Sequence, residues 1–254
     1  MWLQLGIVLV VSLSAASALA QESGDGHADS RILVYDDDDA TTVVTSIASA
    51  ETILPKEVTV GAYAVLDAVS SASVDVVSAA TGRWTENRVE VGATVAVPIA
   101  GTTLSMGANR SQENDWLSHT VSTGVSREFF ERNTIVTAAY AFTRNKVGRA
   151  MDPNFEESLR AHSAEISVGQ LLDRQTRAGV AYTFQALNGF QSSPYRYVAA
   201  TDGASTPEIH PETRKRHALS AFALRSLTPW LSSRLAYRLY RDDWGIWSHT
   251  GSVR

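Results

Sequence analysis

The feature that most constrains this chain is an alternation of apolar and polar residues with a period of two. From Arg88 to Ile99, apolar side chains occupy every second position, and polar or small side chains occupy most of the positions between them. Successive side chains of a β-strand point to opposite faces, so the pattern predicts a strand with one apolar face and one largely polar face.

The same alternation recurs along most of the chain, in runs that centre on residues 58–67, 136–142, 164–172, 178–186 and 235–239. Each run is about ten to twelve residues long. Strands of soluble proteins are most often about five or six residues long, whereas a tilted membrane-spanning strand needs about nine to eleven. The runs therefore predict an all-β protein, and their length favours an antiparallel transmembrane β-barrel.

The connections between the runs support this prediction. Short links fall at residues 54–57, 98–102, 128–133, 173–176 and 227–230. They alternate with mostly longer links at residues 67–86, 113–115, 145–161, 188–216 and 242–247. Short periplasmic turns that alternate with longer external loops are typical of outer-membrane barrels.

The same topology requires a first strand at Asp29–Tyr35, and the count then gives eleven strands with a twelfth that begins at Ser248. Bacterial single-chain barrels usually contain an even number of strands. The chain also lacks the terminal aromatic strand with which such barrels usually end. We therefore expect about 12 or more strands and interpret this chain as an incomplete product.

The first twenty residues have the features of an export signal. An apolar run from Leu5 to Leu13 is followed by the small residues of Ala18-Leu19-Ala20 and then by polar Gln21. We predict a signal peptide over residues 1–20, cleaved after Ala20, and an outer-membrane β-barrel domain over residues 21–254. The segment before the apolar run departs from the usual signal in having no Lys or Arg.

Composition excludes several classes of protein. The net charge is −5, and residues 21–40 contain seven acidic residues against Arg31 alone, so the remainder of the chain is close to neutral. A neutral body argues against a nucleic-acid partner. The absence of Cys excludes disulfides, Cys-ligated zinc and a thiol nucleophile.

Several stretches taken together resemble a domain-of-unknown-function family of bacterial proteins predicted to be outer-membrane barrels. They are Val34–Asp38 with Thr41–Val44, Asp67–Ser73, Asn188–Arg196 and Tyr237–Ile246. The resemblance covers nearly all of the predicted mature chain and implies an outer-membrane location, with no catalytic residues to transfer. This chain departs from the family by stopping soon after its Asp-Asp-Trp-Gly motif.

Two groups of residues follow from the predicted barrel. Charged residues on the polar faces are expected to face the lumen; they are Arg88, Glu90, Glu165, Arg177, Arg234 and Arg238. Aromatic residues near strand ends are expected at the membrane interface; they are Trp84, Trp116, Trp230, Trp244 and Trp247.

Three clusters could bind ions. The carboxylates of Asp36, Asp37, Asp38 and Asp39 suit a loosely bound divalent cation, although a solvated hairpin tip explains them better. The run from Arg214 to His217 either binds phosphate groups of surface lipid or marks where a loop meets the headgroups. His210, His217 and His249 follow no metal-ligand spacing and are interpreted as solvated.

The sequence therefore predicts a passive channel or a structural surface barrel in the bacterial outer membrane, with no firmly held cofactor. Its expected partners are outer-membrane lipid and small solutes, and no protein partner can be inferred. The alternative is a secreted or periplasmic β-sandwich that acts as a binding module. A barrel lipase is less well supported because no Gly-x-Ser-x-Gly motif is present, so we expect no enzyme activity.

Overall fold

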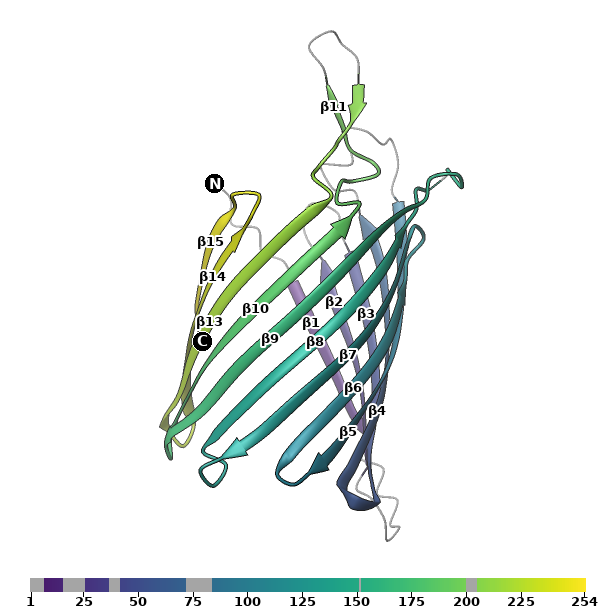
Figure 1. Cartoon of the computed structure of the whole chain (residues 1–254). Coiled ribbons are helices and arrows are strands. Elements are labelled where there is room, and N and C mark those ends of the chain that lie inside the picture. Colours follow the sequence, from purple (N-terminus) through teal and green to yellow (C-terminus); the bar gives the residue numbers. More distant parts are fainter. Residues whose placement is uncertain (1–6, 16–25, 37–41, 72–83, 151, 200–204) are drawn as a thin grey trace. The chain divides into compact units, whose positions relative to one another are not determined.

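The computed structural model describes residues 7–15, 26–36, 42–71, 84–150, 152–199 and 205–254, most of which lie in strands (Figure 1). The strands are β1 (Ile7–Ala15), β2 (Gly26–Asp36), β3 (Thr42–Leu54), β4 (Val58–Ser71), β5 (Trp84–Ile99), β6 (Thr102–Gln112), β7 (Trp116–Phe129), β8 (Thr134–Val147), β9 (Glu157–Asp173), β10 (Thr176–Gly189), β11 (Tyr197–Ala199), β12 (Ser205–Pro207), β13 (Thr213–Thr228), β14 (Leu231–Asp242) and β15 (Trp247–Val253). Within these ranges the only helical element is the 3-10 turn η1 (Pro55–Glu57). No helix among the described residues is long and apolar enough to cross a membrane.

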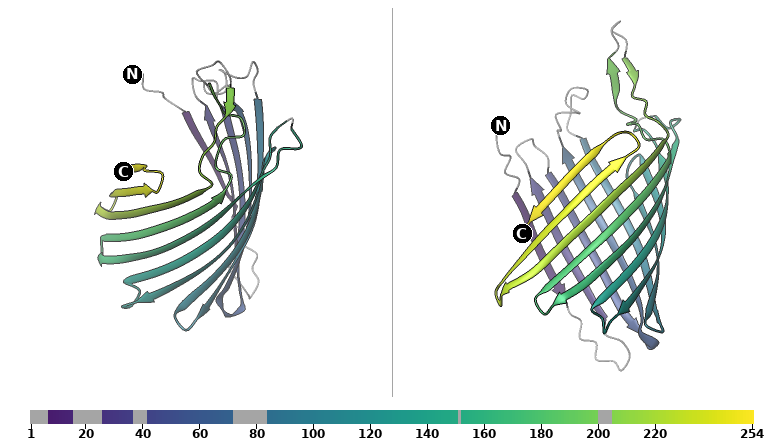
Figure 2. Two further views of the ribbon diagram at one scale, coloured as in Figure 1. Left: turned by 45° about the horizontal axis from the view of Figure 1, so that its top comes forward. Right: turned by 60° about the vertical axis from the view of Figure 1, so that its left-hand side comes forward.

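The chain divides into two compact units, which we describe separately. The first unit contains residues 1–96 and 107–119, and in it β1 to β5 pair antiparallel in chain order. The second contains residues 97–106 and 120–254. In it β8, β9, β10, β13, β14 and β15 pair antiparallel, and Figure 2 shows them side by side from teal to yellow.

The all-β antiparallel fold class predicted from the sequence is confirmed. The strands β2 to β10 and β13 to β15 correspond to the eleven predicted strands and the twelfth, which begins at Trp247, one residue before the predicted start. The strands are generally longer than the apolar runs alone indicated. Polar residues extend them, as Thr85 to Asn87 do near the start of β5.

Two short elements were not predicted. Ile7–Ala15, inside the predicted signal peptide, forms β1 and pairs with β2 from Ile7 opposite Asp36 to Ala15 opposite Ala28. A run rich in Val and Ile has a high β propensity, so it can pair beside β2. The proposed cleavage after Ala20 concerns processing and stays a prediction. The second element is the β11–β12 hairpin within the loop that joins β10 to β13.

Tight turns reverse the chain at the predicted short links. Between β5 and β6, Ala100 and Gly101 have φ angles of 49° and 75°. Positive φ at both central residues is typical of the type I′ turn, whose twist matches that of the two strands it joins. Positive φ angles recur at Phe130, Glu131 and Arg132 between β7 and β8.

One face of the second unit exposes a row of apolar side chains. Along β9, Ala164, Ile166 and Val168 are exposed, whereas Ser163 and Ser167, which alternate with them, are partly buried. We call the face that carries Ile166 the apolar face and the opposite one the polar face. Val180, Leu219 and Leu235 continue the apolar face across β10, β13 and β14, and each is about half exposed.

Few apolar side chains are buried. Among the described residues the buried hydrophobic set is Val147, Leu159, Ala161, Leu187 and Ala218. These residues lie on the polar face of the second unit, toward the end where β8, β10 and β13 meet their longer loops. The apolar surface is therefore not collected in a core.

Candidate functional site

In the first unit, the strand face that carries Arg88 and Glu90 holds a connected network of charged and polar groups, and we call it the polar face of that unit. Glu90 accepts hydrogen bonds from Tyr63 Oη at 2.8 Å, from Asn109 Nδ2 at 2.9 Å and from Arg88 Nη2 at 2.6 Å. Arg88 Nε also lies 3.7 Å from Asp67, whose other oxygen accepts a bond from Thr45 at 2.6 Å. The predicted lumen residues Arg88 and Glu90 therefore belong to one hydrogen-bonded network, because residues two positions apart on a strand lie on the same face.

A second feature of this face is a group of acids. Ligand oxygens of Glu86, Glu113 and Asp115 all lie within 4.8 Å of one another, an arrangement that could hold a cation. A hollow of about 290 Å³ is lined by Glu86 and Glu113 together with Asp67 and Arg88. This group could not be predicted from the sequence, because β5 and the β6–β7 link are far apart in the chain.

The predicted Asp run gives a different result. The side chain of Asp36 accepts a hydrogen bond from Thr42 Oγ1 at 2.7 Å across the β2–β3 link. Asp37, Asp38 and Asp39 lie outside the described residues. The proposed divalent cation therefore stays a prediction.

In the second unit the remaining lumen candidates occupy the polar face. Glu165 accepts a bond from Thr183 at 3.0 Å, and Arg177 is exposed on β10. Arg234 and Arg238 both lie on β14, where their guanidinium groups contact the rings of Phe222 at 5.6 Å and Tyr240 at 5.8 Å. Their placement in a lumen stays a prediction.

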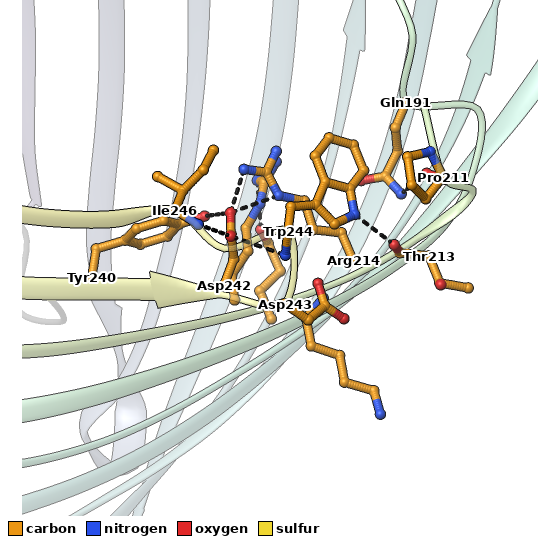
Figure 3. Close-up of polar contacts among 12 residues, drawn as sticks. Gln191, Pro211, Thr213, Arg214, Tyr240, Asp242, Asp243, Trp244 and Ile246 are labelled. Carbon is orange, nitrogen blue, oxygen red and sulfur yellow. Dashed lines mark hydrogen bonds and ion pairs between the residues drawn. The ribbon is translucent and has the colours of Figure 1, made fainter. Parts of the chain in front are cut away.

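The most highly connected group of the second unit is Asp242, at the end of β14 (Figure 3). Its carboxylate accepts hydrogen bonds from Arg214 Nε at 2.9 Å, Tyr240 Oη at 2.9 Å, Ile246 N–H at 2.8 Å and Trp244 N–H at 3.1 Å. Arg214 Nη2 donates a further bond to it. The side chain of Asp242 is fully buried and that of Arg214 is 14 % exposed.

These donors determine the charge state of Asp242. Burial by itself would raise the pKa of the carboxyl, but the bonds from Arg214, Ile246 and Tyr240 favour the ionised form and lower the pKa to about 2. Arg214 also lies 4.2 Å below the ring of Trp244, whose indole N–H donates to the carbonyl of Thr213 at 2.9 Å. This cluster ties the β14–β15 loop to the start of β13.

The basic run from Arg214 to His217 divides between the two faces of β13. Arg214 bonds Asp242, and Arg216 donates to Gln185 at 3.0 Å, so both lie on the polar face. Lys215 and His217 alternate with them and lie on the apolar face. The run therefore does not form one basic patch, because adjacent residues of a strand point to opposite faces.

The apolar face carries three pairs of Tyr and His that the sequence analysis missed. Hydroxyl and Nδ1 atoms lie 2.7 Å apart in Tyr140–His162, 2.7 Å apart in Tyr182–His217 and 2.5 Å apart in Tyr237–His249. The pairs join β8 to β9, β10 to β13 and β14 to β15. The only signal in the sequence was the repeated Tyr-x-Phe at Tyr140 and Tyr182, which means little without the register of the next strand.

The predicted interface tryptophans have varied environments. Trp116 begins β7 and Trp230, in the β13–β14 turn, is 83 % exposed. Trp247 is exposed at the start of β15 and stacks on Arg241 at 4.9 Å, whereas Trp244 packs in the Asp242 cluster. The side chain of Trp84 lies outside the described residues. An interface role for these residues stays a prediction.

These features define an antiparallel β protein with an exposed apolar face and hydrogen-bonded networks on the opposite face. The chain belongs to the DUF3570 family of proteins of unknown function, whose model matches residues 81–254. The resemblance seen in the sequence is thereby confirmed. Among solved structures the chain is similar to OmpTdeltaL8, the loop L8 deletion mutant of OmpT, an outer membrane protein of Vibrio cholerae. That alignment has 7 % identity and a TM-score of 0.45, and it covers 98 % of this chain and 96 % of that one. No curated protein matches the chain.

Substitution of Asp242 tests whether this carboxylate holds the β14–β15 loop. We expect Asp242→Asn to leave Arg214 with an uncompensated buried charge, which costs about 3 kcal/mol, or about 100-fold in local opening. Hydrogen exchange of the Trp244 and Ile246 amides should accelerate by that factor. Asp243→Asn is the matched control, because its carboxylate accepts one bond, from the N–H of Lys215 at 2.9 Å. Unchanged exchange in the first variant, or equal acceleration in both, would contradict this role.

Proposed function

We propose that this protein is a β-barrel of the bacterial outer membrane that acts as a passive channel for small solutes. The observation that carries the proposal is the polarity of the sheet. Large apolar side chains such as Ile166, Val180 and Leu235 are exposed along successive strands. Exposure of such a surface to water is unfavourable, whereas contact with lipid stabilises it.

The polar faces support the channel part of the proposal. The network of Arg88, Glu90 and Asp67 would be costly in a dry core, but it suits a water-filled lumen. In the second unit Arg214 is neutralised by Asp242, which leaves Arg177, Arg234 and Arg238 in excess over Glu165. These arginines of the second unit would attract anions, whereas Glu86, Glu113 and Asp115 in the first unit would attract cations.

The alternative of a soluble β-sandwich receives no support from the described residues. A sandwich buries the apolar face of one sheet against that of another. Here the apolar residues of β9, β10, β13 and β14 remain exposed. The proposal assigns no catalytic residue, and lipid is the partner that it requires.

Membrane integration is the first test. Protein refolded with lipid vesicles should resist extraction with alkaline carbonate and should migrate differently on gels with and without boiling. Both results follow from a lipid-facing apolar surface and from backbone groups that are hydrogen-bonded between neighbouring strands. A protein that stays in the aqueous phase as a monomer without detergent would contradict the proposal.

Charge reversal on β14 tests the channel. We expect the protein to conduct in planar bilayers, and we expect Arg234→Glu with Arg238→Glu to shift the reversal potential toward cation selectivity. The control is Arg225→Glu, on the apolar face of β13, which should leave selectivity unchanged. Membrane-integrated protein that does not conduct would leave the barrel in place and overturn the channel.

A further inference from the structure

The Tyr–His pairs lie along one line across the second unit. The register places Tyr140 level with Phe184, across β9, and therefore two residues beyond Tyr182. From β10 to β14 the offset has the same size and direction. Through β13, Tyr237 is level with Val180, which lies two residues before Tyr182. An offset of about one residue per strand corresponds to a line of constant height when strands tilt by about 35–45°.

Basic residues follow this line on its loop side. On the apolar face Arg144 lies four residues beyond Tyr140 and Arg160 lies two residues before His162. In the same way, Lys215 lies two residues before His217 on β13. Arg241 lies four residues beyond Tyr237 on β14. We call Arg144, Arg160, Lys215 and Arg241 the basic row.

The apolar face is therefore layered along each strand. Ile166, Val180 and Leu235 lie on the turn side of the Tyr–His pairs, and the basic row lies on the loop side. Aromatic rings with polar tips suit the boundary between hydrocarbon and headgroups. If the apolar surface lies in lipid, the basic row is at the level of the headgroups.

The positions within the basic row favour an anion. Arg144 and Arg160 are directly opposite each other on β8 and β9, and both are exposed. Like charges in such a pair repel each other unless an anion lies between them. Lys215 and Arg241 line a hollow of about 490 Å³ with Tyr182, Leu239 and Trp247. Two carboxylates also line it: Asp242, which is paired with Arg214, and Asp243, which accepts a hydrogen bond from the N–H of Lys215. The hollow therefore combines two cationic side chains with the apolar side chains of Leu219 and Leu239, a combination that suits a phosphate group carrying acyl chains.

We propose that the basic row binds the phosphate groups of phosphorylated lipid in the leaflet that surrounds the loop end of the sheet. This inference rests on the proposed membrane location. Lys215 and Arg241 contact one phosphate group, and Arg144 and Arg160 contact another. The bound lipid places its acyl chains against Leu219 and Leu239, which continue from the hollow into the apolar face.

Lipid retention measured by native mass spectrometry tests the proposal. The protein is refolded in detergent micelles that contain bisphosphorylated lipid A, and parallel samples contain the same lipid after enzymatic removal of both phosphates. We expect the phosphorylated lipid to remain bound. Lys215→Gln with Arg241→Gln should weaken retention about tenfold, the usual effect of losing charge-assisted hydrogen bonds. Arg144→Gln with Arg160→Gln should have a similar effect.

Arg225→Gln is the matched control, because Arg225 lies on the same strand and face as Lys215 but at the turn end. It should retain lipid as the unchanged protein does. Equal retention by all variants, or equal binding of the dephosphorylated lipid, would overturn the basic row as a phosphate site. Displacement of the lipid by inorganic phosphate alone would also overturn it, since the site would then recognise the free ion.

The experiment separates this inference from the proposed function. Each variant is first tested for heat-dependent gel migration and for integration into vesicles. A protein that never integrates contradicts the membrane barrel itself. A protein that integrates normally but shows no dependence on Lys215, Arg241 or the lipid phosphates contradicts only the phosphate site.

Discussion

A strand places successive side chains on opposite faces, and in this chain large apolar side chains are exposed along one of these faces. The other features of the sheet depend on this constraint. Because Ile166 and Val180 are exposed, the serines and charged groups that alternate with them must share the opposite face. In the first unit, taken by itself, the network around Glu90 likewise requires partners that lie on neighbouring strands in register. Backbone pairing from strand to strand satisfies the main chain at the same time.

The loop end of the second unit combines two kinds of interaction. On the polar face, the buried Asp242 carboxylate gathers donors from β13, β14 and the following loop, so it fixes their relative positions. On the apolar face, at nearly the same residues, Lys215 and Arg241 are exposed above aromatic and aliphatic groups. One short sequence, Arg214 to His217, contributes to both because its side chains alternate between them. Because the polar-face contacts of Asp242 fix the β14–β15 loop, they also fix the positions of Lys215 and Arg241 on the opposite face.

The sequence predicts the strands well because period-two alternation is a local property. The twelve predicted strands, their turns and the shared face of Arg88 and Glu90 follow from spacing alone. The strand β1 was not predicted, because its apolar run is also typical of an export signal. Its pairing with β2, which shows that the run forms a strand, cannot be seen in the sequence.

The contacts of the candidate sites could not be predicted in the same way. Arg214 and Asp242 are 28 residues apart, and their contact depends on the register of β13 with β14. The Tyr140–His162 pair depends likewise on the register of β8 with β9. The basic run from Arg214 to His217 was interpreted as one group because its residues are adjacent in the sequence. On β13 they divide into two pairs, one on each face.

The central claim is that the apolar face of this sheet contacts lipid while the polar face contacts water. Residues 163–168 of β9 test it most directly, and the absence of native Cys allows single cysteines to be placed there and spin-labelled. In vesicles, collision with oxygen should peak at positions 164, 166 and 168, and collision with a water-soluble nickel complex should peak at 163, 165 and 167. We expect these two profiles to be in opposite phase. Profiles in the same phase, or with no period of two, would contradict it.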